Sequence, residues 1–487
     1  MTVKQALTFL LLLPVLLASS QTFGNLDFET TCSDSKTSLC HWDVSWDYQI
    51  TACTTAQTNR GQSLLISSQE EAGIGYVEQT AQIETPSSLK MITFTGKIKT
   101  RDVQGKGAGV TINTLDTAGN YLFVNDLEKE GHDLYTGTLD WQNFSLRTVV
   151  DAATATVKIG GILYGKGQVW FDDFHIEITP LEQQQPSEVA QTYIDQVCKI
   201  IAQHSIRRDS IDLAKLKAQA LKVAGPAGTF ADCHLAVRHL ISGLGDHHSF
   251  LMPLETYNSW SDSKDTPGSI PLPTHRPIQD FAYLSIPGFH SGDEELKIAY
   301  ADRIQAALRH YDQQNIDGWI IDLRPNNGGN MEPMLAGLGP LFSAKTVGYL
   351  VDVDGKREPW GYKKKAPFCG SYTGTPATNP VKLKNKNLPM AVLIGPQTGS
   401  SGEIVVLSFV GNKNTRLFGQ PTWGISTGNG DFELPDGARL FLTSTIMADR
   451  TGKLYGGKVY PDELVKPGKE GGDPVLERAL EWLTRNQ

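Results

Sequence analysis

The chain has 487 residues, too many for one ordinary domain, and 40% of them are hydrophobic, enough to bury more than one core. Acidic side chains outnumber basic ones by 53 to 44, which gives a net charge of -9. Such a charge would repel a phosphate backbone, so the composition argues against a nucleic acid partner.

The N-terminus has the pattern of an export signal. Lys4 precedes an apolar run over residues 6–17, and small residues follow where a signal peptidase needs them. The run is shorter than the roughly 20 apolar residues that span a bilayer, so a membrane anchor is the weaker interpretation. We expect residues 1–20 to be removed as a signal peptide. The mature protein, beginning at Gln21, is then expected to be secreted or periplasmic and not to be held in a membrane.

The six cysteines are compatible with an oxidising compartment, which permits disulfides. Cys32 and Cys40 bracket a short polar loop and are the best candidate pair. The cysteine spacings lack the paired CxxC pattern of a zinc site, so no metal is expected.

Residues 21–179 alternate short β-rich runs, such as 91–95, 109–112 and 167–171, with turn residues. This pattern predicts an antiparallel β-sandwich domain. The opening NLDFE and the closing GQVWFDDFHIEI are similar to the first and last strands of galactose-binding-like jelly-roll domains. Some of those domains bind sugars and others only pack against a catalytic domain, so the resemblance makes carbohydrate a candidate partner.

A polar, proline-containing linker is expected at residues 180–190. Apolar residues then recur at helical spacing in three segments, which predicts a small helical bundle, the helical subdomain, over residues 191–260. The third segment starts at Thr229 with Asp232 as a capping-box acid. It ends at glycines and leads into the turn Gly245-Asp246-His247-His248-Ser249-Phe250.

Residues 261–487 alternate strand and helix patterns, which predicts an α/β core with βαβ crossovers and a largely parallel sheet. The stretch 438–459 has two extended runs around a turn and predicts a hairpin. The expected strands are 281–286, 318–323 and 390–394, and the expected helices are 294–311, 331–341 and one that opens after Ser400.

Two turns in this core join a strand to a helix. The first contains Gly328 and Gly329, whose N–H groups can point at an oxyanion, although a tight turn can need glycine for packing alone. The second contains Ser400 and Ser401 at a helix start, where the dipole favours negative charge. Serine is also a common N-cap there, and the strict Gly-x-Ser-x-Gly elbow of α/β-hydrolases is absent.

A serine nucleophile needs a base, and the sequence has eleven histidines. His247 and His248 differ from most of them because they follow a helix, in a turn where a side chain can face a cleft. Two adjacent histidines can also indicate a metal, but no third ligand clusters with them, so we expect none.

Four motifs resemble, in their order and spacing, the C-terminal processing (tail-specific) peptidase family, which includes tricorn protease. They are LGDHHSFL, GWIIDLRPNNGGN, TGSSGE and LPDGARL followed by DRTGKLYGGKVYPDELV. The resemblance covers residues 185–470. It implies a crotonase-like α/β fold, hydrolysis of peptide bonds through an acyl-enzyme, a polypeptide or peptide substrate and no cofactor.

Matched to this family, Ser400 takes the place of the nucleophile, and Ser401 with the glycine pair supplies the oxyanion donors. The lysine base of the processing branch would fall on Ile425, so the Ser-Lys dyad is absent. The tricorn-like branch uses a histidine instead, and the match places that base on His248.

The third catalytic group is left open by the sequence. The tricorn-like branch orients its histidine through a serine or an acid, and the glutamate expected before Pro461-Asp462 is missing. The sequence does not choose among the remaining candidates for this orienting partner. They are Ser249, Asp246, Glu403, Asp449 and Glu433.

The leading interpretation is an exported serine endopeptidase that acts through Ser400 and His248. The alternative is a non-catalytic ligand- or peptide-binding protein on the same fold, because interphotoreceptor retinoid-binding proteins also resemble this family. The stretch between Pro253 and Phe281 is too short for the PDZ module of many tail-specific proteases, so recognition of a free C-terminus is not expected.

Overall fold

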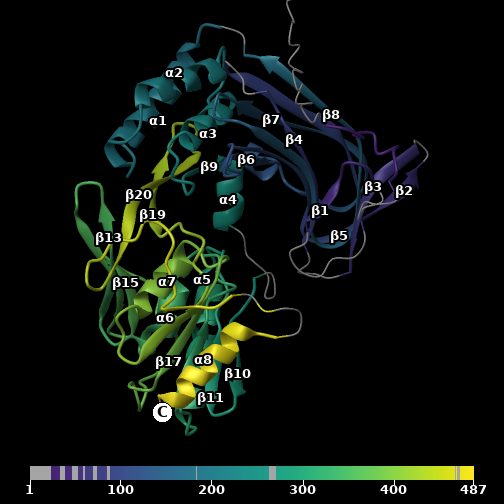
Figure 1. Cartoon of the computed structure of the whole chain (residues 1–487). Coiled ribbons are helices and arrows are strands. Elements are labelled where there is room, and N and C mark those ends of the chain that lie inside the picture. The colour runs from purple at the N-terminus through teal and green to yellow at the C-terminus, as the bar shows by residue number, and fades with distance from the viewer. Residues whose placement is uncertain are drawn as a thin grey trace, which may run out of the picture. The chain divides into compact units, whose positions relative to one another are not determined.

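The structure is a computed structural model, and it divides the chain into two compact units (Figure 1). The first comprises residues 1–126 and 134–180, and the second comprises residues 127–133 and 181–487. The predicted signal peptide lies outside the described residues. The structure describes residues 23–486 except 33–38, 46–52, 59–60, 70–73, 85–87, 182–183, 263–269, 467 and 469–471.

Antiparallel strands make up the N-terminal unit, which confirms that part of the predicted fold class. Side chains alternate between buried and exposed along β4, as expected where one face of a sheet covers a core. Residues 91–95 and 109–112 lie in one long strand, β5, whose register shifts near its middle. The strands are β1 (Asp43–Ser45), β2 (Cys53–Thr58), β3 (Gly61–Ser68), β4 (Ile74–Gln82), β5 (Lys90–Leu115), β6 (Tyr121–Asp126), β7 (Tyr135–Val150) and β8 (Thr156–Pro180).

The two end motifs of this unit pack against each other. The rings of Phe28 and Phe174 lie 5.1 Å apart in an edge-on arrangement, and the Phe174 N–H donates to the Leu26 carbonyl at 3.0 Å. Both phenylalanines are buried. The opening and closing segments of the domain therefore share one aromatic core.

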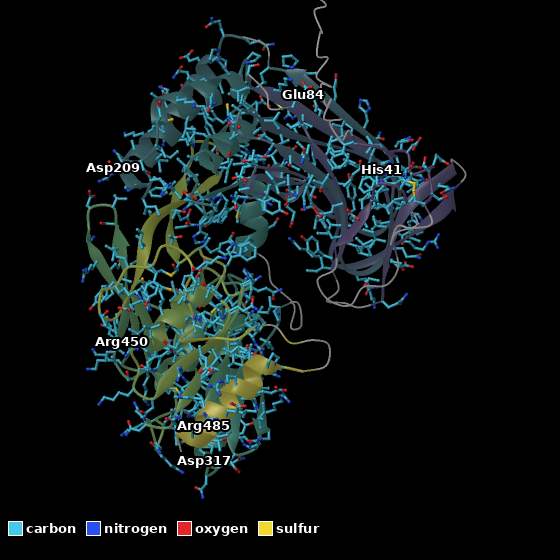
Figure 2. The ribbon with its side chains drawn as sticks, viewed as in Figure 1. His41, Glu84, Asp209, Asp317, Arg450 and Arg485 are labelled. Carbon is cyan, nitrogen blue, oxygen red and sulfur yellow. A yellow bond between two sulfur atoms is a disulfide. The ribbon has the colours of Figure 1, made fainter. Side chains whose placement is uncertain are left out.

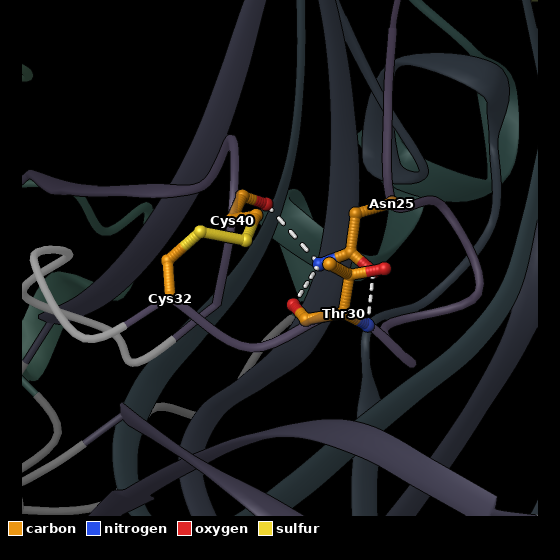
Figure 3. Close-up of a disulfide and its surroundings, with 4 residues drawn as sticks. All are labelled: Asn25, Thr30, Cys32 and Cys40. Carbon is orange, nitrogen blue, oxygen red and sulfur yellow. Dashed lines mark hydrogen bonds between the residues drawn. A yellow bond between two sulfur atoms is a disulfide. The ribbon is translucent and has the colours of Figure 1, made fainter.

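The predicted disulfide between Cys32 and Cys40 is present (Figure 3). Asn25, which precedes it in the chain, ties the same loop together. The Asn25 side-chain amide donates to the carbonyl oxygens of Thr30 at 2.8 Å and Cys40 at 3.1 Å. In return, its amide oxygen accepts from the Thr30 N–H at 2.8 Å.

Helices open the second unit, as the apolar periodicity predicts. They are α1 (Glu188–His204), α2 (Leu213–Ala224) and α3 (His234–Ser242), and they share a core with β9 (Phe250–Met252). The predicted capping box is formed between Thr229 and Asp232. A 3-10 turn, η2 (Ala231–Cys233), follows it, so α3 begins later than predicted. Helix α4 (Leu254–Asp262) was not predicted.

A six-stranded sheet forms the centre of the α/β part, with the order β10-β11-β12-β17-β18-β21. β10 is antiparallel to its neighbour and the remaining pairs are parallel. The predicted strands and helices of this layer are therefore present. The strands are β10 (Thr274–Ile278), β11 (Phe281–Ser285), β12 (Gly318–Asp322), β17 (Met390–Ile394), β18 (Thr415–Gly419) and β21 (Glu463–Leu464).

Successive side chains of this sheet enter opposite cores, as the period of two in a strand requires. Trp319 and Ile321 share a core with helices on one face, and Ile320 shares a core with α8 (Pro474–Arg485) on the other. The helices on the first face are α5 (Glu294–Asp312), α6 (Met331–Leu338, continued by η3, Gly339–Leu341) and α7 (Ser401–Phe409). Figure 2 labels Asp317, just before β12, and Arg485, at the end of α8.

In addition to the largely parallel sheet that the alternation of strands and helices predicted, the second unit also contains a second, antiparallel sheet. Its order is β16-β15-β14-β13-β20-β19, and β9 pairs with β20. The predicted hairpin over 438–459 is only partly formed, because its second run meets the first in a single bridge between Ala448 and Leu454. The strands are β13 (Thr346–Asp352), β14 (Arg357–Lys363), β15 (Ala366–Cys369), β16 (Tyr372–Thr373), β19 (Thr427–Glu433) and β20 (Arg439–Asp449).

In the described part of the chain, no helix is both long enough and apolar enough to cross a membrane.

Candidate active site

Ser400 lies at the start of α7, on the turn that follows the buried strand β17. Its backbone has φ 50° and ψ -118°, a conformation that only glycine adopts without strain. The carbonyl of Ser400 accepts from the backbone N–H groups of Glu403 at 2.8 Å and Ile404 at 3.2 Å. The helix thus begins with a serine held in a costly conformation, with its side chain half-buried.

His248 lies in the turn between α3 and β9, and three hydrogen bonds fix the backbone there. The Asp246 carboxylate accepts from the N–H groups of His248 at 3.0 Å and Ser249 at 2.8 Å. The Asn429 side-chain amide donates to the His248 carbonyl at 2.8 Å. His247, which lies between Asp246 and His248, has a positive φ of 55°. The turn is therefore strained next to the imidazole.

The imidazole of His248 connects two hydroxyl groups. Its Nε2 atom lies 3.1 Å from Ser400 Oγ, and its Nδ1 atom lies 2.8 Å from Thr427 Oγ1. Burial lowers the pKa of His248 to about 4, and the nearby negative charge of Asp246 opposes that shift only in part. At neutral pH the ring is therefore uncharged, with one nitrogen able to accept a proton.

Thr427 is a residue of the site that the sequence did not predict. It is the first residue of β19, which pairs with β20, and β20 in turn pairs with β9, directly after the histidine turn. Its only sequence signal is its place two residues after Ile425, the position where the family resemblance would place a lysine base.

Ser249 and Asp246, two of the candidate orienting partners, bond to each other. Ser249 Oγ donates to Asp246 Oδ2 at 2.7 Å and lies 3.2 Å from Thr443 Oγ1. Their polar atoms therefore shape the turn that carries His248, while the Nδ1 position is taken by Thr427.

Glu403 is fully buried and joins the Ser400 turn to the segment 422–425. Its two carboxylate oxygens accept from the Ser400 N–H at 3.0 Å, the Thr422 hydroxyl at 2.5 Å, the Gly424 N–H at 3.3 Å and the Ile425 N–H at 3.1 Å. Burial raises the pKa of Glu403 to about 7, against the lowering effect of these donors. Because every partner is a donor, the ionised carboxylate is the form that fits.

The two candidate oxyanion turns lie side by side, because β12 and β17 are neighbouring parallel strands. A side chain at Gly328 would come within 2.9 Å of Ser400 Cβ, and one at Gly329 would collide with the Phe289 carbonyl, so both positions require glycine. The Ser401 hydroxyl donates to the Gly329 carbonyl at 2.5 Å. The Gly328 N–H donates to Asn326 Oδ1 at 3.1 Å.

Comparison with known proteins gives a family for part of the chain. Residues 280–465 match Peptidase family S41. These residues therefore form a domain of the S41 serine peptidase type.

Proteins similar to this chain include a nisin-resistance protein from Lactococcus lactis, 28% identical over 66% of this chain and 92% of its own length. A carboxyl-terminal-processing protease from Synechocystis is 26% identical over 41% of this chain and 42% of its own length. Among solved structures, a lipoprotein from Streptococcus agalactiae has a TM-score of 0.50 and 24% identity, covering 62% of this chain and 98% of that one. That similarity shows a shared fold.

Asp449 and Glu433, the last two candidates for the residue that orients His248, bond to other groups. Asp449 accepts from the Thr451 hydroxyl at 2.6 Å and from the Lys453 N–H at 3.2 Å, within its own turn. Glu433 pairs with Arg439 at 2.7 Å across β19 and β20. These acids therefore stabilise the second sheet, and the structure does not bring them to His248.

Proposed function

We propose that this S41 peptidase hydrolyses peptide bonds through an acyl-enzyme formed on Ser400, with His248 as general base and acid. The observation that carries the proposal is the 3.1 Å separation between His248 Nε2 and Ser400 Oγ. That distance is within the range for direct proton transfer from a nucleophile to its base.

In the first step, Ser400 Oγ attacks the carbonyl carbon of the scissile bond as its proton passes to His248 Nε2. This requires the tautomer in which Nδ1 carries a proton and donates it to the Thr427 hydroxyl oxygen. The imidazolium then gives its proton to the leaving amine, and the carbon–nitrogen bond breaks. Water repeats the cycle on the ester, with His248 again as base, and frees Ser400.

Thr427 acts as the positioning residue for His248. A hydroxyl is neutral, so it holds the ring plane without the charge that an aspartate would add to stabilise the imidazolium. The pKa of His248, lowered to about 4 by burial, is consistent with that weaker support. The ring is a weak base that is unprotonated over the whole neutral range.

The negative charge that develops on the substrate oxygen needs donors near Ser400. We propose the N–H groups of Ser401 and Gly329 for this role. Ser401 is the first residue of α7, where backbone N–H groups lack partners within the helix and the dipole favours an anion. Gly329 is preferred over Gly328, whose N–H already donates to Asn326.

For the finer classification, we propose the histidine-using, tricorn-like branch, because Ile425 occupies the lysine position and His248 lies at the serine. For the fold, we propose that the α/β part is crotonase-like and that the N-terminal unit is a jelly roll. The disulfide between Cys32 and Cys40 supports export to an oxidising compartment. N-terminal sequencing of the protein recovered from outside the cytoplasm should then begin at Gln21.

Active-site labelling tests the mechanism. A fluorophosphonate should modify the mature protein at Ser400, as located by mass spectrometry, and Ser400→Ala should abolish the modification. His248→Ala should slow it strongly, while the matched control His247→Ala, which changes the exposed neighbouring histidine, should label far faster than His248→Ala. Absence of labelling in the wild-type protein near neutral pH would favour the non-catalytic alternative.

A further inference from the structure

Trp423 is a large, solvent-exposed apolar side chain in a segment that bonds to the turn carrying the proposed nucleophile. Its exposed fraction is 61%, although tryptophan is usually mostly buried in folded proteins. An exposed indole forgoes the hydrophobic stabilisation that burial would supply. Trp423 is therefore a candidate for a surface that another molecule covers.

The backbone that carries Trp423 is rigidly held. The Trp423 N–H donates to the Thr398 carbonyl at 2.8 Å, two residues before Ser400. On one side, the Thr422 hydroxyl bonds to the buried Glu403, and on the other the Gly424 N–H bonds to the same carboxylate. The exposed indole thus projects from a fixed backbone segment, so no loop has to be ordered when a ligand packs on it.

Trp423 and Ile425 border the residue that precedes the nucleophile. A side chain at Gly399 would come within 3.4 Å of Trp423 Cβ and 3.6 Å of an Ile425 methyl group. Because Gly399 has no side chain, nothing from that residue separates this apolar pair from the Ser400 turn. Ile425 is also the position where lysine-using relatives carry their base, so here the same place supplies apolar surface.

We propose that Trp423, with Ile425, forms a subsite for a large apolar or aromatic side chain of the peptide substrate, at one residue next to the scissile bond. The inference rests on the proposed function of Ser400. Packing of an apolar side chain on the indole removes both surfaces from water. Trp423 is thus the specificity-determining residue of this peptidase.

The test compares peptide preference in matched variants. A random peptide library digested by the wild-type protein, with cleavage sites read by mass spectrometry, should be enriched in Phe, Leu or Trp at one position flanking the cleaved bond. For peptides that differ only there, the ratio of kcat/KM for Phe over Asp should fall about 10- to 200-fold in Trp423→Ala. Trp423→Phe should keep most of the ratio. Leu464→Ala, an exposed apolar side chain on β21, should leave it unchanged.

An unchanged ratio in Trp423→Ala, or a library with no apolar preference, would overturn the subsite. A binding measurement keeps this outcome separate from failure of the proposed chemistry. In the Ser400→Ala background, the Phe peptide should bind more tightly than the Asp peptide by fluorescence anisotropy, and Trp423→Ala should remove the difference. The wild-type protein could fail to react with the fluorophosphonate while the Phe peptide still binds more tightly. That outcome would reject the mechanism and retain the apolar binding surface.

Discussion

The Nδ1 atom of His248 lies 2.8 Å from the hydroxyl oxygen of Thr427, two residues that are 179 positions apart in the chain. An imidazole that must accept a proton at Nε2 has to keep one at Nδ1, and the Thr427 hydroxyl oxygen can accept a hydrogen bond from that N–H. The contact also fixes the ring toward Ser400. A neutral hydroxyl therefore takes the position that a carboxylate occupies in a Ser-His-Asp triad.

Thr427→Ala should lower kcat/KM without unfolding the protein. A lost hydrogen bond to the base costs about 1 to 3 kcal/mol, which corresponds to a fall of roughly 5- to 150-fold. Thr427→Ser keeps the hydroxyl and should recover most of the rate. Equal loss in both variants would show that the methyl group matters and that the hydroxyl does not orient the histidine.

The pH profile of kcat/KM should report Glu403 as well as His248. Only the ionised carboxylate accepts all four donors that hold the Ser400 turn, and burial raises its pKa to about 7. The rate should therefore fall as the pH decreases through about 7. It should fall again near pH 4, where His248 becomes protonated. Glu403→Gln should lower the rate and abolish the step near 7. Persistence of that step in the variant would assign it to another group.

Ionisation of the Glu403 carboxyl group should lower the stability of the folded protein, although it raises the rate. The pKa of this group in the folded protein lies above the ordinary value of 4.5, so the folded state binds the proton more tightly than the unfolded state. The resulting stabilisation is complete below about pH 4.5 and is lost as the pH rises through 7. The urea concentration at the midpoint of unfolding should be higher at about pH 5 than at about pH 8. This difference should be larger for the wild-type protein than for Glu403→Gln.

The sequence predicted those parts of the site that depend on local pattern. Ser400 and the pair Gly328 and Gly329 follow buried strands, and the alternation of strands and helices shows that such turns meet at the carboxyl edge of a parallel sheet. Family resemblance then added His248. Thr427 could not be found this way, because a threonine at the start of a strand has no distinctive local signal. Its place depends on the pairing of β19, β20 and β9 across distant parts of the chain.

Ser400→Gly should stabilise the protein while abolishing its labelling. The positive φ of Ser400 is strained for any residue with a Cβ atom and costs about 1 to 3 kcal/mol, which glycine would relieve in part. Thermal denaturation should show a higher midpoint for the variant. Asn414→Gly provides the matched control, since Asn414 also has a positive φ, 55°, but asparagine tolerates that region and the gain should be smaller. A midpoint below that of the wild-type protein would mean that the serine contacts outweigh the strain.

Arg324 should be the most sensitive charged residue outside the site. Its guanidinium donates to Asp322, whose side chain is almost fully buried at the end of β12, and to Asp473, which caps α8. Arg324→Met leaves the buried carboxylate without its cation and should cost about 3 to 5 kcal/mol of unfolding free energy. Asp473→Ala removes the more exposed partner, 37% accessible, and should cost less. Chemical denaturation measures both, and a larger loss in Asp473→Ala would place the main stabilisation at the helix cap instead of the buried pair.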